Sequence, residues 1–302
     1  MPSLAISGVR IGHVTRDGTG VTVMLFPAGS VGSAEVRGGA PATRETEVLH
    51  PLRTVARIDA LVFAGGSAFG LAAADGVVRY LAERGQGYAT AAGPVPIVPA
   101  ACVFDLLESS GAPPGPRDGY EAAAVAARGE GFETGPVGAG AGATVGKWRG
   151  RAGAVPGGVG IAAGEVDGVR IGALVVVNAL GDVVAADGSI LAGSVAPAEA
   201  PAFPTPEPFE ESRANTTLAA VFLDAAIDKS GCHLVAQSAH DGFARALRPA
   251  HTRFDGDVAF AIATGAPSSE VVPNLDRLRV VAADVVAGAI RAATVRNDTN
   301  DG

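Results

Sequence analysis

The sequence is poor in cysteine and in aromatic residues, and each shortage excludes something. Of 302 residues only 2 are cysteines, Cys102 and Cys232, which are too few for a disulfide framework and have no metal-ligand spacing. We therefore expect a reduced, cytoplasmic protein. Aromatic residues make up 5% of the chain, against 48% for all hydrophobic types. The core must therefore be built mainly from Ala, Val, Leu and Ile.

Positive charge is also scarce. The chain has 23 Lys and Arg against 31 Asp and Glu, a formal net charge of −8, and its only lysines are Lys147 and Lys229. Nucleic acids and anionic membranes are bound through a basic surface that displaces counterions. No run reaches about 18 apolar residues, and the start, "MPSLAISGVRIGH", has neither a basic segment nor an apolar signal core. We expect no nucleic-acid partner and no membrane partner.

Glycine and proline are plentiful, with 42 and 20 residues, and they divide the chain into short apolar elements. Up to residue 194 the pattern predicts strands and helices, with Ser67 as a possible helix cap. The expected strands are 20–27, 58–66 and a pair around an "LGD" turn at 169–186, and the expected helices are 67–85 and 120–129. Strands buried on both faces that alternate with helices predict a layered α/β fold.

An acidic, proline-rich stretch at 195–213 interrupts this pattern, and the same pattern then resumes. The elements expected after it are strands at 216–225 and 257–265 and helices at 229–247 and 275–295. Two strands are too few for an independent sheet. We therefore expect these strands to pair with those of the first part, so that residues 1–302 form one domain from two segments.

The second segment begins in an unusual way, at "SRANTTLAAVF". A threonine at the start of a strand is most often just a β-branched residue on a pleated surface. If the bond before Thr216 were cut, however, Thr216 would have both a hydroxyl and a free α-amine. That amine has a reference pKa of about 7.7 to 8.0, so it could act as its own general base at neutral pH. A nucleophile activated in this way needs no histidine.

Two other segments carry candidate residues. In "HTRFDGDVAF", Asp255 and Asp257 flank a glycine at a strand entry, where they form either a pair of aimed carboxylates or a polar turn. In the Gly-rich segment 135–160, Lys147 has close to P-loop spacing, but Trp148 stands where that motif requires a hydroxyl. A lone lysine in such a loop is ordinarily solvated.

Several common sites are not indicated. The "FAGGSAFG" loop lacks the dinucleotide-binding glycine pattern. The five histidines have no metal-ligand spacing, and there is no G-x-S-x-G motif. These are His13, His50, His233, His240 and His251. We predict no cofactor, no metal site and no serine triad.

Long motifs in a fixed order give the chain a strong family resemblance. The sequence resembles the self-processing L-aminopeptidase/D-esterase enzymes, whose relatives include β-aminopeptidases and 6-aminohexanoate oligomer endohydrolases. The motifs include "VRGGAPATRET", "FAGGSAFGLAAADGVVRYL", "VPIVPAACVFDL", "GAGATVGKW", "VVVNALGDV", "NTTLAAVFLDA" and "AHDGFARALRPAHTRFDGD". The resemblance implies a four-layered αββα sandwich, similar in chemistry to N-terminal-nucleophile hydrolases but with distinct connectivity, commonly assembled as a homotetramer.

The same resemblance implies a self-cleaving precursor. The cut falls between Asn215 and Thr216, leaving a heavy chain of residues 1–215 and a light chain of residues 216–302. Four residues fall on family positions around the nucleophile: Lys147, Asn178, Asp255 and Asp257. The substrates that the resemblance implies are small peptides, amino-acid amides or esters, and amide oligomers. For Lys147, two roles are open: lowering the pKa of the amine or assisting the oxyanion.

One departure and two alternatives accompany the resemblance. Some relatives have a tyrosine beside the scissile carbonyl where this chain has Phe104, which cannot donate a hydrogen bond. Asn178 and backbone N–H groups must then do more to stabilise the oxyanion. The alternatives are an acyltransferase of the ornithine acetyltransferase type, whose usual signature differs from "NTTL", and a non-catalytic module that binds an anion in its glycine loops.

Overall fold

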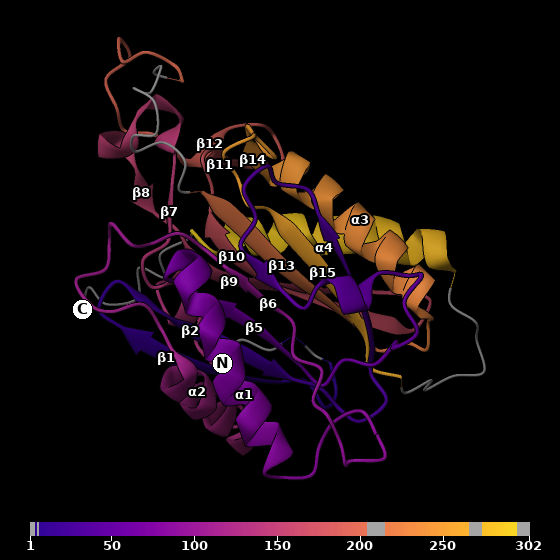
Figure 1. Cartoon of the computed structure of the whole chain (residues 1–302). Coiled ribbons are helices and arrows are strands. Elements are labelled where there is room, and N and C mark those ends of the chain that lie inside the picture. The colour runs from indigo at the N-terminus through magenta and orange to yellow at the C-terminus, as the bar shows by residue number, and fades with distance from the viewer. Residues whose placement is uncertain (1–3, 5, 204–214, 266–273, 295–302) are drawn as a thin grey trace.

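The computed structural model describes residues 4, 6–203, 215–265 and 274–294, and it is a mixed α/β structure as the sequence predicts (Figure 1). One five-stranded sheet has the order β1 (Arg10–Arg16), β2 (Thr19–Leu25), β5 (Ala60–Ala64), β6 (Ala100–Cys102) and β4 (Thr43–Arg44). A second has the order β3 (Val31–Val36), β15 (Val258–Ala263), β13 (Thr216–Leu223), β10 (Val169–Asn178) and β9 (Gly158–Val166).

Smaller elements complete the described part of the chain. A three-stranded sheet is formed by β12 (Ile190–Ala192), β11 (Asp182–Val184) and β14 (Leu247–Arg248), and a two-stranded one by β7 (Thr144–Val145) and β8 (Val155–Pro156). The α-helices are α1 (Ala73–Ala82), α2 (Pro116–Arg128), α3 (Lys229–Ala246) and α4 (Leu275–Ala292). Short 3-10 helices include η2 (Ser67–Ala72) and η4 (Lys147–Arg149). No helix in the described ranges combines the length and the apolar character needed to cross a membrane.

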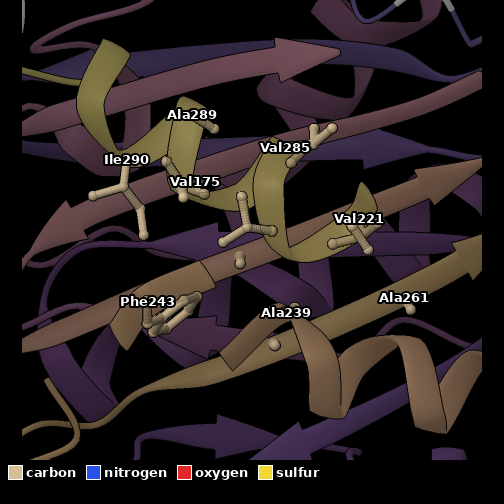
Figure 2. Packing of buried hydrophobic residues seen from close by; sticks show 14 of the residues in the cluster. Val175, Val221, Ala239, Phe243, Ala261, Val285, Ala289 and Ile290 are labelled. Carbon is tan, nitrogen blue, oxygen red and sulfur yellow. The ribbon is translucent and has the colours of Figure 1, made fainter. Parts of the chain in front are cut away.

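The two helix pairs cover different sheets. Helices α1 and α2 pack on the β1–β2 sheet, and α3 and α4 pack on the sheet that contains β13 (Figure 1). Figure 2 shows how α3 and α4 pack on the sheet that contains β13. Val221 and Ala261 from the strands belong to one apolar cluster with Phe243 and Val285 from the helices. A third apolar cluster, which includes Phe63, joins the inner faces of the two sheets. Small side chains fill much of this core, as the composition requires.

Two helix starts differ from expectation. Ser67 does not cap a helix: it lies in η2 with a φ of 53° and makes no capping hydrogen bond, because Gly66 makes the left-handed turn before it. Helix α2 begins at Pro116, before the expected residue 120. Proline is favoured in the first turn, and the Asp118 carboxylate accepts the N–H of Gly115 at 3.0 Å.

Strands from both sides of the 195–213 stretch are interleaved in one sheet. Strand β13 pairs antiparallel with β10 and parallel with β15, and β15 pairs antiparallel with β3. The later strands therefore lie between two earlier ones. This order supports our proposal that residues 1–215 and 216–302 fold as one unit.

We expect residues 216–302 expressed alone to be insoluble or unfolded. Strands β13 and β15 are buried along their whole length, and without β3 and β10 they would leave both edges and the β1–β2 face uncovered. Circular dichroism with thermal melting tests this, with the same segment co-expressed with residues 1–215 as the control. A cooperative melt from the isolated segment would contradict the single-unit proposal.

Candidate active site

The sheet register brings the ends of three segments together around the Asn215–Thr216 peptide. Thr216 begins β13 and lies opposite Asn178, the last residue of β10, because antiparallel neighbours place opposite ends side by side. Asn215 forms a parallel bridge with Asp255, just before β15. Asn215 and Thr216 are 3% and 4% exposed. The peptide that the sequence singles out is thus buried at a meeting point of polar side chains.

Two donors converge on the carbonyl oxygen of Asn215. The Thr216 hydroxyl donates to this oxygen at 2.5 Å, and the backbone N–H of Gly256 donates to it at 2.9 Å. A Cβ added to Gly256 would lie 2.8 Å from Thr216 Oγ1 and 2.7 Å from the Ala40 carbonyl oxygen. The position therefore requires glycine, and the Asn215 carbonyl has both a side-chain hydroxyl and a backbone N–H beside it.

Lys147 is buried against Asn178, so the ordinary expectation of a solvated loop lysine is wrong here. Its Nζ donates to Asn178 Oδ1 at 2.8 Å and to the Asn178 carbonyl at 3.2 Å. The Asn178 side chain also accepts the Thr144 N–H and donates to the Phe104 carbonyl, which fixes its amide plane. Burial lowers the pKa of Lys147 to about 7, although the charge of Asp255 acts in the opposite direction.

Asp255 is a buried carboxylate with three hydrogen-bond donors. Its Oδ2 accepts from the Thr252 N–H at 2.9 Å and the Thr252 hydroxyl at 2.6 Å, and its Oδ1 accepts from the Leu180 N–H at 3.3 Å. Burial, together with the neighbouring charge of Asp257, raises the pKa of Asp255 to about 6. Asp255 can therefore exchange a proton close to neutral pH.

Asp257 is held differently. Its Oδ1 accepts the Thr217 N–H at 2.7 Å, so it contacts β13 one residue after Thr216. Its Oδ2 accepts from His251, through the ring Nδ1 at 2.8 Å and the backbone N–H at 3.2 Å. Sequence reasoning did not place His251 at this site. Its only local signal was its position, six residues before Asp257 in the same motif.

The segment "VRGGAPATRET", residues 36–46, is hydrogen-bonded to the backbone of the Asp255–Asp257 turn. The Ala40 N–H donates to the Asp255 carbonyl at 2.9 Å, and the N–H groups of Arg37 and Gly38 donate to the Asp257 carbonyl at 3.0 and 3.1 Å. A Cβ on Gly38 would lie 2.2 Å from the Asp257 nitrogen. The glycines allow the two backbones to approach closely. The D-G-D turn is thus clamped in place.

Two solved structures with the same fold are those of an aminopeptidase and an aminopeptidase/esterase. A Burkholderia β-aminopeptidase matches with a TM-score of 0.70 and 22% identity over 96% of this chain and 85% of that one. The L-aminopeptidase D-Ala-esterase/amidase from Ochrobactrum anthropi, described as a variant of the Ntn hydrolase fold, matches with a TM-score of 0.70 and 19% identity, over 96% and 84% of the two chains. The present fold is therefore of the Ntn-hydrolase type.

Sequence relatives define the family. The model of peptidase family S58 matches residues 4–302. An uncharacterized aminopeptidase of Mycobacterium bovis is 42% identical, over 96% of this chain and 92% of its own. A 6-aminohexanoate-oligomer endohydrolase of Agromyces is 30% identical, over 94% and 80%. The chain belongs to peptidase family S58 and is a hydrolase of the aminopeptidase/amidase kind, which confirms the resemblance seen in the sequence.

Proposed function

We propose that this chain cuts itself between Asn215 and Thr216 and then acts as an N-terminal-threonine amidohydrolase. The observation that carries the proposal is the convergence on the Asn215 carbonyl of the Thr216 hydroxyl, at 2.5 Å, and the Gly256 N–H, at 2.9 Å. A positioned nucleophile and a positioned donor are the two elements that acyl transfer needs.

Self-cleavage proceeds as an N-to-O acyl shift. Thr216 Oγ1 attacks the Asn215 carbonyl carbon, the C–N bond breaks and an ester forms, which water then hydrolyses. The Gly256 N–H stabilises the negative charge that develops on the Asn215 oxygen. The hydroxyl loses a proton and the leaving nitrogen gains one. We assign this exchange to Lys147 and Asp255, the neighbouring groups whose pKa values are about 7 and about 6.

Cleavage releases the α-amine of Thr216, which then serves as the general base for substrate hydrolysis. Asn178 donates to the substrate oxyanion through its amide, held in plane by Lys147 and the Phe104 carbonyl. Phe104 takes part in this network only through its backbone carbonyl. Its ring has no hydrogen-bond donor, so it cannot take over the role of the tyrosine hydroxyl found in some relatives. Asp255 and Asp257 orient the end of β13 and attract cationic substrate groups.

Small peptides, amino-acid amides or esters and amide oligomers are the proposed substrates, in keeping with relatives named aminopeptidase and 6-aminohexanoate-oligomer endohydrolase. An acyltransferase and an anion-binding module are less favoured, because the whole chain matches a peptidase family. We also propose the four-layered αββα arrangement, with a homotetrameric assembly and a cytoplasmic location. The three apolar clusters, two under helix pairs and one between sheets, support the layer order.

A substrate panel tests the activity. Precursor purified in denaturant is refolded by dilution, and samples are assayed over time with aminoacyl p-nitroanilides, β-peptides and 6-aminohexanoate oligomers. Hydrolysis of at least one class should rise in step with the cut fraction, because only cutting frees the Thr216 amine. Hydrolysis by chains that remain uncut, or transfer to an added amine in place of hydrolysis, would contradict the proposal.

A further inference from the structure

His251 has hydrogen-bond acceptors on both sides of its ring. Nδ1 lies 2.8 Å from Asp257 Oδ2, and Nε2 lies 3.4 Å from the carbonyl oxygen of His240. A backbone carbonyl can only accept, and both Asp257 oxygens already accept backbone N–H groups, from Thr217 and from His251 itself. A ring that donates from both nitrogens carries both protons and a positive charge. The geometry is that of an imidazolium paired with a carboxylate.

The backbone and the surroundings of His251 favour this pairing. Its φ is 54°, a left-handed conformation that a non-glycine residue adopts at a cost. In that conformation its N–H and its ring both reach the same oxygen of Asp257. Its ring lies edge-on to His240, with centroids 4.8 Å apart, and stacks on Phe243 at 5.4 Å, so helix α3 holds the plane of the ring.

The charged groups around His251 set its protonation. Burial alone would lower its pKa, but the hydrogen bond and charge of Asp257, with the His240 carbonyl, raise it above the ordinary value. One positive neighbour acts against protonation, Arg37, whose backbone N–H donates to the Asp257 carbonyl. Burial lowers the pKa of His240 itself to about 3, so that ring is neutral at physiological pH. Asp257 therefore outweighs the opposing groups.

We propose that His251 is a positioning residue for the self-cleavage reaction. Its ring pairs with Asp257, so that the exchangeable proton of the Asp255–Asp257 turn rests on Asp255. The inference rests on the proposed function, because it assigns the parts of that reaction. Two neighbouring carboxylates that could not easily both ionise are thereby given different roles. Asp257 stays charged and holds the Thr217 N–H, which fixes the start of β13, while Asp255 exchanges the proton.

The test compares His251→Gln and His251→Asn with a matched control, His233→Gln. His233 is another partly buried histidine between a backbone carbonyl, of Ala34 at 3.1 Å, and a carboxylate, of Glu35 at 3.5 Å, but it does not contact the D-G-D turn. Refolded precursor is followed by intact-mass spectrometry between pH 5 and pH 9. Without the imidazolium the carboxylate pair binds a proton more readily, so the acid limb of the rate profile should move up by about one pH unit.

The expected result is a rate loss that approaches about 10-fold at pH 5 and shrinks toward pH 8 in both His251 variants. His233→Gln should retain the wild-type profile. An equal loss at every pH would indicate a purely structural role and overturn the inference. A wild-type profile in the His251 variants, or the same shift in His233→Gln, would also overturn it.

A second measurement needs no cleavage and separates this inference from the proposed function. In a Thr216→Ala background, His251→Gln should lower the melting temperature more at pH 6 than at pH 9. A group whose pKa is raised on folding contributes stability that is fully present below its unfolded pKa, about 6.5, and is lost as the pH rises through its folded pKa. A pH-independent loss would reject the ion pair. Failure of the wild-type chain to cut, with this pH dependence intact, would reject self-cleavage and the positioning role of His251 in it, and would retain only the His251–Asp257 ion pair.

Discussion

Replacement of Thr216 by alanine should leave the chain as a single polypeptide of 29.9 kDa without amidase activity. Without Oγ1 nothing beside the Asn215 carbonyl can begin the acyl shift, and the uncut chain never gains a free α-amine at residue 216. Intact-mass spectrometry after prolonged incubation measures the outcome. Because the loss is of the nucleophile itself, this is the largest effect that we expect.

Two neighbouring substitutions control for damage to the strand. Thr216→Ser keeps a hydroxyl at the same position and should still cut. Thr217→Ala should also cut, because Asp257 contacts the Thr217 backbone N–H, and the Thr217 hydroxyl has no hydrogen-bond partner among the described residues. Normal cleavage of Thr216→Ala would refute the assignment of the nucleophile.

Asp257→Asn should reduce self-cleavage and turnover by about 10²- to 10⁴-fold, the usual range when general acid–base catalysis is disrupted, because Asp257 holds the start of β13 and leaves the exchangeable proton on Asp255. The melting temperature should change little at pH 9 and fall at pH 6, where the charge pair with His251 is lost. Asparagine keeps the shape and can still accept the Thr217 N–H through its oxygen. Its NH₂ group would then face His251, which can accept that bond only as a neutral ring. The substitution thus removes the charge pair while it preserves the packing.

Rate constants from quenched time courses, with calorimetric melting of the same samples, measure this effect. Asp59→Asn is a suitable control: Asp59 is also a buried carboxylate that accepts a backbone N–H, from Ile97 at 2.9 Å, but it lies outside the site. Wild-type rates in Asp257→Asn would mean that residues 255–257 are a polar turn. The proton exchange would then belong to Lys147 or to the Thr216 amine alone.

Local sequence patterns predicted most of the elements, because their causes are local. The strand expected from residue 216 is β13, and helix 229–247 is α3, which begins where the Asp228 side chain accepts the Gly231 N–H. Ser67 was misassigned because the backbone conformation of Gly66, rather than a side-chain cap, determines that turn. A propensity for capping does not reveal which residue adopts φ > 0.

The candidate site depends on contacts between distant parts of the chain, which local patterns cannot reveal. The glycine-rich loop by itself is typical of a solvated lysine, and only the family resemblance placed Lys147 near the nucleophile. In the structure Lys147 is buried and donates to Asn178, which lies 31 residues later. The D-G-D motif drew attention to its carboxylates, whereas the donor to the Asn215 carbonyl is the backbone N–H between them. A backbone group leaves no trace in the sequence except the requirement for Gly256. Only the family resemblance connected these segments in advance.

Self-cleavage at one defined bond is the central claim, and the intact mass of the refolded wild-type chain, followed over time, tests it most directly. We predict that the precursor mass decays into two fragments, one ending at Asn215 and one beginning at Thr216, whose masses together equal the precursor plus one water. The two fragments should co-purify under native conditions, because β13 and β15 lie between β3 and β10. A precursor that persists uncut while folded, or a second fragment that begins at any other residue, would contradict the account.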